Sequence, residues 1–433
     1  MLTAVTGINW GDEGKGRVID LLAEHADIVV RYQGGNNAGH TVVNKQGKFV
    51  LNLLPSGILH PDVVCVLGDG MVIDLNHLSN EIAQIRTQDV SVSPKNLKLS
   101  TRATISMPWH KIQDELEEER LSKSGAAFGS TKRGIAYAYS DKYRKKTIRL
   151  GDLLHLDEEN VQARLKTMLE AKTLELAGCY HQEPMSLSAL LSWCRQKAAK
   201  YAPYITDTGA FIEDALSKGK RVVLEAQLGA MRDIDYGIFP YTSSSSTISA
   251  YGPIGAGIPG ASLDHVVGVL KAYSTCVGAG PFVAEKAMNG EWTEMVRKYG
   301  GEYGAATGRP RRVGPFDAVA SRYGLKCQHA DKIALTKLDV LSIMDQIPVI
   351  TGYQYKNAVT NVFDPTENLE KYTPVVKMLP GWKTDISNCR SYDELPVNAK
   401  RYINFLEDML RHEIQFVSVG AERNQYLLNG KWL

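Results

Sequence analysis

The stretch Trp10-Gly11-Asp12-Glu13-Gly14-Lys15-Gly16 follows a short apolar run, Leu2 to Val5, and precedes an apolar-periodic stretch, Val18 to Ala23. This pattern predicts a strand, a tight glycine loop and a helix. Such a loop directs backbone N–H groups and a helix N-terminus at one place, which favours the binding of a phosphate group. Lys15 adds a positive charge, whereas Asp12 is unusual because a carboxylate repels phosphate. We interpret Asp12 as a ligand for Mg²⁺ or as a proton acceptor.

The loop departs from the standard P-loop, in which a glycine and four further residues precede Gly-Lys-Ser/Thr. Asn9 stands where the first glycine would be, and Gly16 follows Lys15 where the hydroxyl residue would be. The usual hydroxyl ligand for magnesium is therefore missing, and Asp12 is the nearest candidate to replace it. The alternative interpretation is a glycine-rich turn that carries surface charges.

The composition is that of an ordinary globular chain. Of the 433 residues, 44% are hydrophobic and 23% are charged, which is typical of soluble domains. The length is compatible with two or three domains or with one large body, and we predict a single large α/β catalytic domain over residues 1–433. The net charge of +2 gives no sign of a surface for nucleic acid.

Nothing in the sequence indicates a membrane or an oxidising compartment. No apolar run reaches the roughly 18 residues of a spanning helix, and the N-terminus enters a predicted strand directly, without the pattern of a signal peptide. The six cysteines are scattered and form no Cys-x-x-Cys pair, as is usual in a reducing compartment. We therefore expect a cytoplasmic protein that binds neither membranes nor nucleic acid.

Predicted strands alternate with predicted helices, which favours an open, mostly parallel central sheet flanked by helices. Residues 157–200 show helical periodicity with charged faces, so we expect a helical insertion at about 105–220, and small β insertions elsewhere. The patterns predict strands at 27–32, 41–43, 49–54, 62–67, 221–225, 264–273, 332–338 and 414–418, and helices at 75–86, 109–121 and 397–411.

A second polar loop, Gln33 to His40, follows the second predicted strand. Because the carboxyl ends of parallel strands meet at one edge of a sheet, this loop can lie beside the first one. Histidine is the side chain best suited to donate a proton near neutral pH. A lone histidine is more often structural, but the neighbouring phosphate loop makes His40 a candidate catalytic acid.

The sequence Thr336-Lys337-Leu338-Asp339 ends an apolar run and resembles the guanine-reading element of GTP-binding proteins. Guanine presents N1–H and an N2 amine, two donors that one carboxylate can accept together, while a lysine stem can lie along the base. Solvated charges at the end of a strand are the alternative. Together with the phosphate loop, the motif predicts a guanine-binding subregion at about 330–433.

Three polar segments are candidates for binding anions. Gly304 to Arg312 carries three arginines, whose planar guanidinium groups bind carboxylates and phosphates. Lys142 to Arg149 forms a second basic cluster, and the hydroxyl run Thr242 to Thr247 could donate several hydrogen bonds to a phosphate. A solvated surface loop is the alternative in each case.

In order and over nearly the whole chain, these stretches resemble the adenylosuccinate synthetase family. The matching pieces are Trp10–Gly16, Arg31–Gly35, Asn37–Thr41, Leu54–Ile58, Asp233–Asp235, Lys271–Thr275, Val277–Phe282, Leu335–Val340 and Leu379–Trp382. The resemblance implies a P-loop-related fold and a GTP-dependent ligase of AMP synthesis that condenses IMP with L-aspartate through 6-phosphoryl-IMP. It also implies Mg²⁺ and a homodimer.

The resemblance further implies roles for individual residues. Asp12 would remove the N1 proton of IMP and bind Mg²⁺ together with the carbonyl of Gly39, His40 would act as the acid, and Lys15 would neutralise phosphate charge. The residues that would bind GTP are Gly11, Gly14, Lys15, Gly16, Gly39, Thr41, Arg311, Lys337, Asp339, Ser418 and Gly420. Those that would bind IMP are Asp12, Asn37, Thr131, Lys145, Arg149, Gln227 and Ser243, and those for aspartate are Thr307 and Arg309.

The chain departs from the family pattern around the acceptor nucleotide and aspartate. Ala226-Gln227-Leu228-Gly229 stands where the family usually has Gly-Ala-Gln-Gly, so the glutamine that touches IMP is shifted or lost. Cys276 replaces an arginine, Ala306 replaces a threonine, and Lys145 replaces the arginine that crosses the dimer interface. Smaller departures are Asn36, residues 131–138 and Val283-Ala284.

Three interpretations remain. The chain is a divergent member of the family, or a paralogue that uses the same chemistry on another purine nucleotide such as (d)GMP or with another amine, or a GTP-binding module without catalysis. Asp12 and His40 have no reason to be present together in a module of the last kind.

Overall fold

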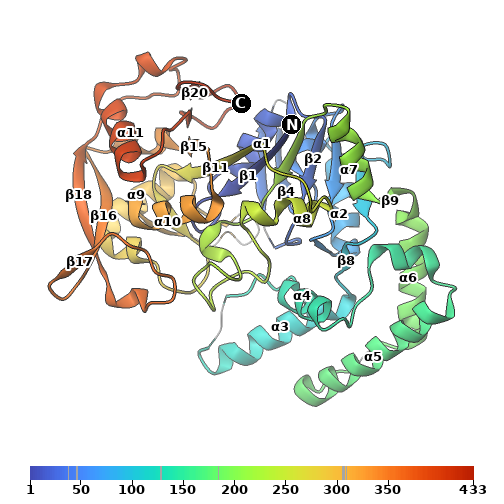
Figure 1. The fold of residues 1–433 in the computed structure, drawn as a ribbon. Helices are drawn as coiled ribbons and strands as arrows, with labels where there is room; N and C mark the ends of the chain where they lie inside the picture. Colours follow the sequence, from blue (N-terminus) through green and yellow to red (C-terminus); the bar gives the residue numbers. More distant parts are fainter. Residues whose placement is uncertain (38, 45–46, 127–128, 184, 305–307, 309) are drawn as a thin grey trace.

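The computed structural model describes residues 1–433 except 38, 45–46, 127–128, 184, 305–307 and 309. Its described residues build a ten-stranded sheet through the middle of the molecule (Figure 1). The only antiparallel pair within the described part of this sheet is β19 with β20, at one edge. In spatial order the strands are β20 (Tyr426–Leu428), β19 (Phe416–Ser418), β15 (Lys332–Thr336), β11 (His265–Lys271), β1 (Leu2–Gly7), β10 (Val222–Glu225), β2 (Ile28–Arg31), β5 (Val64–Leu67), β7 (Leu97–Ser100) and β9 (Ile205–Thr206).

Strand β1 lies near the centre of this sheet, between β10 and β11. Every residue of β1 is buried, as expected of a parallel strand covered on both faces. Its side chains alternate: Leu2 and Ala4 pack into one apolar cluster, and Val5 packs into another with Val18 and Ile19 of α1 (Lys15–Ala23). The carboxyl ends of the parallel strands therefore share one edge, where the loops with polar side chains meet.

Helices surround the sheet, and small strand pairs are inserted between its elements (Figure 1). The remaining helices are α2 (Leu75–Arg86), α3 (Pro108–Lys123), α4 (Ile135–Tyr143), α5 (Glu159–Tyr180), α6 (Leu187–Tyr201), α7 (Thr208–Ser217), α8 (Gly252–Ala256), α9 (Gly290–Gly300), α10 (Ala318–Gln328) and α11 (Val397–Leu410). The smaller sheets comprise β3 (His40–Asn44) with β4 (Gly47–Leu51), β6 (Val72–Ile73) with β8 (Thr104–Ile105), β12 (Ser274–Cys276) with β13 (Arg312–Gly314), and β14 (Phe316–Asp317), β16 (Gln346–Tyr355), β17 (Ala358–Thr360) and β18 (Thr373–Pro380). This arrangement confirms the predicted α/β class.

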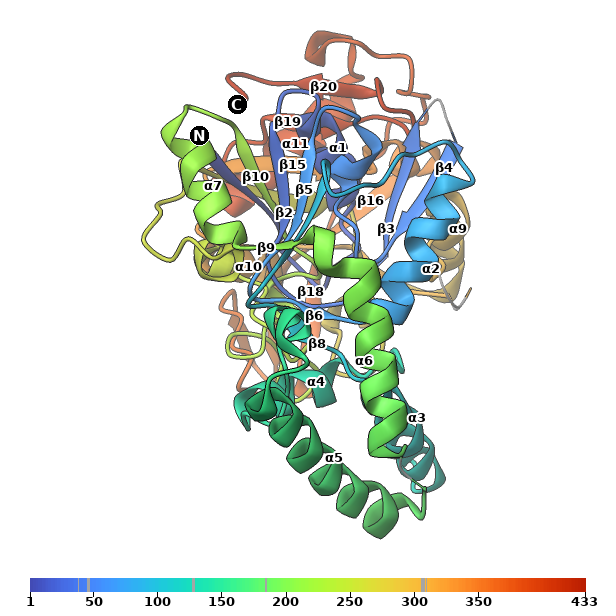
Figure 2. The ribbon, with the colours of Figure 1, turned by 90° about the vertical axis from the view of Figure 1, so that its right-hand side faces the viewer.

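Helices α3, α5 and α6 extend away from the sheet, and Figure 2 shows α5 as the outermost of them. They are joined to the body by apolar packing, because Leu165 of α5 and Leu190 of α6 belong to the same buried cluster as Leu97 of β7. In the described part of the chain, no helix combines the length and the apolarity that a membrane crossing requires.

Several predicted boundaries were wrong by a few residues. The strand predicted at 332–338 ends at Thr336, because Lys337 has a left-handed φ of 58° that stops the strand. Helix α11 ends at Leu410 instead of 411 for the same reason, since Arg411 has a φ of 59°. The strand predicted at 49–54 runs from Gly47 to Leu51. Strands 264–273 and 414–418 shorten to His265–Lys271 and Phe416–Ser418.

Asp317 caps helix α10 from a fully buried position. Its Oδ1 accepts a hydrogen bond from Ala320 N at 3.0 Å, and its Oδ2 accepts one from the Tyr353 hydroxyl at 2.6 Å. Burial raises the pKa of the Asp317 carboxyl from 3.8 to about 6, although these hydrogen bonds oppose the shift.

This raised pKa predicts a pH-dependent stability. Between pH 3.8 and about 6 the unfolded chain ionises Asp317 and the folded chain does not, so stability falls by about 3 kcal/mol as the pH rises. Asp317→Asn should remove this contribution, and its stability relative to the parent chain should improve by about that amount between pH 4 and pH 7. Unfolding in denaturant at both pH values measures this difference in stability. Asp207→Asn changes the exposed N-cap of α7 in the same way, so it controls for the effect of an asparagine cap. Parallel pH curves for Asp317→Asn and the parent chain would contradict the prediction.

Candidate active site

A cavity of about 370 Å³ lies where the loops after β1, β15 and β19 meet strand β3. It gathers most of the predicted catalytic and GTP-binding residues, which come from distant parts of the sequence. Those that line it are Asp12, Gly14, Lys15, Gly16, Gly39, His40, Thr41, Arg311, Lys337, Asp339, Ser418 and Gly420. The cavity therefore joins the predicted phosphate loop to the predicted base-reading element.

The phosphate loop is held by Glu13, which the sequence reasoning did not single out. Its buried carboxylate accepts hydrogen bonds from the backbone N–H groups of Asn9 at 3.1 Å and Gly11 at 2.8 Å. Its other oxygen lies 2.6 Å from Lys15 Nζ, and both side chains are almost fully buried. Glu13 thus holds the loop in place and orients the ammonium group of Lys15. Its position inside the glycine motif was the feature of the sequence that could have indicated this role.

At two positions of the loop, steric contacts explain why the residue is glycine. Gly11 has a φ of 99°, and a Cβ there would lie 3.2 Å from Cα of Leu228. At Gly16 a Cβ would lie 3.2 Å from Cβ of His40, tighter than an ordinary carbon contact. The hydroxyl residue of a standard P-loop would therefore crowd His40, which explains why glycine stands at this position.

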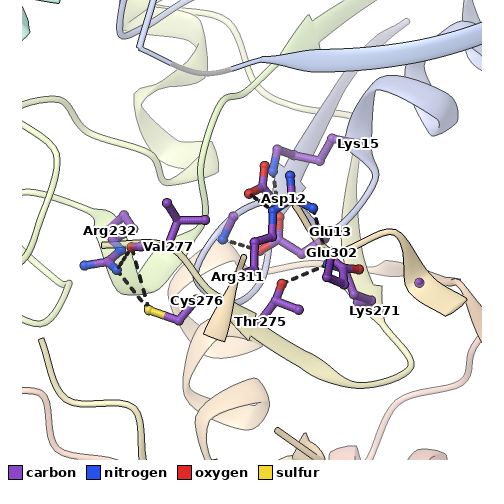
Figure 3. Close-up of polar contacts among 12 residues, drawn as sticks. Asp12, Glu13, Lys15, Arg232, Lys271, Thr275, Cys276, Val277, Glu302 and Arg311 are labelled. Carbon is purple, nitrogen blue, oxygen red and sulfur yellow. Dashed lines mark hydrogen bonds and ion pairs between the residues drawn. The ribbon is translucent and has the colours of Figure 1, made fainter. Parts of the chain in front are cut away.

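Asp12 and Arg311 lie side by side in the lining of the cavity, as Figure 3 shows. Asp12 Oδ2 lies 3.1 Å from Arg311 Nε, and about a third of the Asp12 side chain is exposed. Arg311 also reaches a second carboxylate, because its Nη1 lies 2.6 Å from Glu302 Oε2. The cavity therefore contains a carboxylate that is accessible to a ligand but is paired with an arginine.

His40 lies on β3 with its imidazole buried against Glu225 at the end of β10. His40 Nδ1 is hydrogen-bonded to Glu225 Oε1, and Glu225 also accepts from Ser56 N at 2.8 Å and Ser56 Oγ at 3.0 Å. Burial lowers the pKa of the His40 imidazole, and the Glu225 carboxylate opposes this shift. His40 Nε2 is buried and has no hydrogen-bond partner among the described residues, so it is the nitrogen left for a ligand.

The base-reading end of the cavity is closed by Arg17, another residue that the sequence reasoning missed. Its guanidinium donates to Ser418 Oγ at 2.6 Å, to the carbonyl of Gln425 at 2.9 Å and to the carbonyl of Gly420. Arg17 is in the first turn of α1, so it ties the phosphate loop to the segment after β19. Burial raises the pKa of the nearby Asp339 carboxyl, although its own backbone N–H, Lys337 and Arg17 oppose the shift.

Of the residues expected to bind IMP, Asp12 is the one that lines this cavity within the described part of the chain. Gln227 is fully buried, and its Nε2 donates to the carbonyls of Gln33 at 2.7 Å and Gly35 at 3.2 Å. Leu228, whose φ is 62°, stands on the cavity wall instead. The other expected residues, Asn37, Thr131, Lys145, Arg149 and Ser243, lie away from the cavity lining, and Thr307 and Arg309 lie outside the described residues.

The two other polar segments have structural partners. Thr247 N and Ser246 Oγ donate to Asp233 Oδ2 at 2.6 and 3.1 Å, so the hydroxyl run is an ordered loop around a buried carboxylate. In the basic cluster, Arg144 Nη1 lies 2.7 Å from Glu175 Oε1 on α5, whereas Lys145 is exposed.

The parallel sheet, the glycine loop with an acidic residue, the buried histidine and the guanine-type element define a nucleotide-dependent ligase of the α/β class. The family model of adenylosuccinate synthetases matches residues 4–427. The chain belongs to the adenylosuccinate synthetase family. It is a GTP-dependent enzyme that joins IMP to L-aspartate in purine biosynthesis and uses Mg²⁺.

Curated relatives and solved structures agree with this assignment. The chain is 43% identical to the adenylosuccinate synthetase of Carboxydothermus hydrogenoformans, over 98% of this chain and 97% of that one. It is 42% identical to that of Pelotomaculum thermopropionicum, over 99% and 98%. The fully ligated enzyme from Plasmodium falciparum matches with a TM-score of 0.90 at 37% identity, covering 99% of both chains.

A more distant structure shares the fold alone. The succinoaminodeoxyadenylate synthetase of cyanophage S-2L, bound to dGMP and dATP, matches with a TM-score of 0.59 at 18% identity, covering 99% of this chain and 95% of that one. The relatives at about 40% identity therefore decide between the interpretations, and the acceptor is IMP.

Proposed function

We propose that Asp12, His40 and Lys15 transfer the γ-phosphoryl group of GTP to the 6-oxygen of IMP in this cavity, before the aspartate amine displaces it. GDP leaves in the first step, and inorganic phosphate leaves C6 as the new C–N bond forms. The observation that supports this proposal is that one cavity is lined by an accessible carboxylate, a lysine and a histidine together with Lys337 and Asp339.

In this proposal Asp12 accepts the N1 proton of IMP, which makes the 6-oxygen a better nucleophile. Its carboxylate is partly exposed and lies at the mouth of the phosphate loop. Asp12 exchanges its contact with Arg311 for IMP and Mg²⁺ when these bind, since both of them need its carboxylate oxygens. Arg311 then contacts the triphosphate of GTP.

His40 assists the transferring phosphoryl group through Nε2, while Glu225 holds Nδ1. A carboxylate partner fixes the tautomer and the orientation of an imidazole. Burial lowers the pKa of His40 in the ligand-free chain, and an anionic phosphoryl group nearby favours the protonated form that can donate. Lys15, held by Glu13, neutralises charge that develops on the phosphoryl oxygens.

Asp339 accepts the N1–H and N2 amine of guanine, with Lys337 along the base and Ser418 and Gly420 at the pocket edge. Burial disfavours the charged form of the half-buried Asp339 carboxylate, and two donors from guanine would offset that cost. Gly11, Gly14, Gly16, Gly39 and Thr41 complete the proposed GTP site around the phosphates.

The cavity also fits a magnesium ion. Mg²⁺ prefers oxygen ligands and is commonly held by one or two carboxylates together with substrate phosphates. Asp12 and Gly39 line the same cavity beside the phosphate loop. The Asp12 carboxylate and the Gly39 carbonyl would hold the ion, which when bound would neutralise phosphate charge.

The acceptor and aspartate sites complete the proposal. Members of the family are typically dimeric, and Lys145 is exposed at the end of α4 with a φ of 61°, a position from which it could reach a partner subunit. We assign Asn37, Thr131, Lys145, Arg149, Gln227 and Ser243 to IMP, and Thr307 and Arg309 to aspartate. We further propose one cytoplasmic catalytic unit over 1–433, with a helical insertion at about 105–220 and a guanine-binding subregion at about 330–433.

Phosphate release tests the proposal directly. With GTP and Mg²⁺ present, release should require both IMP and L-aspartate, and a panel of nucleoside monophosphates that includes GMP and dGMP should support none beyond IMP. Hydrolysis of GTP that does not depend on IMP would contradict the proposed order of steps.

Replacing Glu225 with glutamine tests the histidine pair. A neutral amide cannot stabilise the imidazolium as the carboxylate does, so kcat should fall by about 10- to 100-fold while the KM values for GTP and IMP change little. Steady-state kinetics measure this effect. Glu81→Gln is the matched control, because Glu81 is also a buried carboxylate but accepts only from the backbone N–H groups of residues 52–54 among its described hydrogen bonds. An equal loss of kcat in both variants would contradict the catalytic role of the pair.

A further inference from the structure

Glu302 is a fully buried carboxylate to which the roles above give no function. It follows α9, and its backbone is fixed on both sides: Glu302 N donates to the carbonyl of Arg297, and Arg311 N donates to the carbonyl of Glu302, each at 2.9 Å. Its side chain is 0% exposed. The carboxylate therefore has one defined position behind the cavity.

Three cations share this single carboxylate. Glu302 Oε1 lies 3.0 Å from both Lys271 Nζ and Lys337 Nζ, and it accepts a hydrogen bond from the Tyr273 hydroxyl at 2.5 Å. Glu302 Oε2 lies 2.6 Å from Arg311 Nη1. Figure 3 shows Glu302 between Lys271 and Arg311, with Asp12 on the far side of the arginine.

The electrostatics of this cluster depend on Glu302. Burying a charge is costly unless it is paired, and burial lowers the pKa of Lys271 to about 8 although Glu302 opposes the shift. Burial disfavours the ionised form of Glu302, but Lys271, Lys337 and Arg311 outweigh it and hold the pKa of Glu302 far below its usual range. Glu302 is therefore the carboxylate that Lys271, Lys337 and Arg311 share beside the phosphate loop, and Arg311 has Asp12 as a second partner.

Arg311 lies between two carboxylates, Asp12 and Glu302, that have different proposed roles. Its Nε is 3.1 Å from Asp12, and its Nη1 is 2.6 Å from Glu302. Asp12 must be free when the substrates are bound, whereas Arg311 must stay in the cavity to meet the phosphates. With Glu302 as a second anchor, Arg311 can release Asp12 without leaving; without Glu302, Asp12 would be its remaining carboxylate partner among the described contacts.

We propose that Glu302 is a positioning residue that holds Arg311 and Lys337 ready for the donor nucleotide and keeps Arg311 in the cavity when Asp12 exchanges it for the substrates. This inference rests on the proposed function of Asp12 and of the cavity. The Glu302 carboxylate connects Lys337, which is proposed to contact the base, with Arg311 beside Asp12, because Lys337 Nζ and Arg311 Nη1 contact different oxygens of Glu302.

Glu302→Gln is the first test, because it keeps the shape and removes the charge. Hydrogen bonds to charged groups are among the strongest in proteins, so the KM for GTP should rise by about 10-fold or more and kcat should fall by a similar factor. The KM for IMP should stay within about 2-fold, which a general structural defect would not produce. Glu285→Gln is the matched control: Glu285 pairs with the neighbouring Arg312 at 2.8 and 2.6 Å on the surface, and its loss should leave the kinetics unchanged.

A double-mutant cycle with Arg311→Leu decides whether Glu302 acts through the arginine. In the Arg311→Leu background, Glu302→Gln should lower kcat/KM for GTP by a smaller factor than in the parent chain, because one of the two cations that it positions is already gone while Lys337 remains. Full additivity, parallel changes in the KM for GTP and IMP, or unchanged kinetics for Glu302→Gln would overturn the proposal. If Glu302→Gln does not fold, Glu302→Asp keeps the charge but shortens the reach, and it should raise the KM for GTP in the same direction by a smaller factor; an unchanged KM would then overturn the proposal.

The same assays separate this inference from the proposed function. An active Asp12→Ala enzyme would show that the proposed function of Asp12 fails. An inactive Asp12→Ala enzyme together with unaffected Glu302→Gln kinetics would overturn the role of Glu302 alone.

Discussion

Replacing Asp12 with alanine is expected to lower kcat by about a thousandfold or more while the chain stays folded. The physical reason is that the N1 proton of IMP then has no acceptor at the phosphate loop, and Mg²⁺ loses its carboxylate ligand. Since about a third of the Asp12 side chain is exposed and its described ion pair is with Arg311 alone, the substitution removes little packing. Phosphate release in the presence of GTP, IMP and aspartate measures the loss.

The backbone at Asp12 requires its own control, because its φ of 59° is unusual for a residue other than glycine. Asp89 has a φ of 61° at an exposed position. Asp89→Ala therefore reproduces any backbone strain that alanine adds at such an angle, and it should leave kcat unchanged. Asp12→Asn keeps the shape of the side chain and should be as inactive as Asp12→Ala. Turnover of either Asp12 variant close to that of the parent chain would disprove the assignment of Asp12 as the base.

Asp339→Asn is expected to raise the KM for GTP by about 100-fold or more, because the amide offers one acceptor and one donor to a base edge that presents two donors. Xanthosine triphosphate carries an oxygen in place of the N2 amine, so the amide donor of the variant can pair with it. We therefore expect this nucleotide to be a poor donor for the parent chain and a better one than GTP for the variant. Steady-state kinetics with both triphosphates measure the exchange.

The control for this exchange is Asp385→Asn. Asp385 is an exposed carboxylate in the same part of the chain, and it accepts a hydrogen bond from the backbone N–H of Ser387 at 2.8 Å. It should leave the preference for GTP unchanged. If Asp339→Asn kept both its affinity for GTP and its discrimination against xanthosine triphosphate, the base would have to be read by another group.

Much of the fold could be predicted because its signals are local. Continuous apolar runs identified the buried parallel strands, and the glycine loop between a strand and a helix identified the phosphate site. Errors arose at element ends, where one left-handed residue such as Lys337 or Arg411 stops a strand or a helix. Charged residues adopt such angles without an obvious pattern in the neighbouring sequence, so these ends could not be predicted from periodicity.

The candidate site was predicted less completely. Asp12, Lys15, His40 and Asp339 were predicted from motifs, and the structure places all four on one cavity. Glu13, Arg17 and Glu225 were missed as members of the site, because a carboxylate or a guanidinium reads as an ordinary charge until its partner is known. Arg17 stands two residues after Lys15 in the first turn of a helix, which was the one local signal that it faces the same loop.

Local sequence was thus sufficient to identify the α/β class, the phosphate loop and the guanine-type element, since each depends on residues that are neighbours in the chain. The pairing of His40 with Glu225 joins residues 185 positions apart, and Asp12 pairs with Arg311 from a segment that is still more distant in the chain. Such pairings arise from the order of strands in the sheet, which brings the carboxyl ends of β1, β10, β11 and β15 together. The charges that control this site are therefore set by strand order and burial, and these appear once the chain is folded.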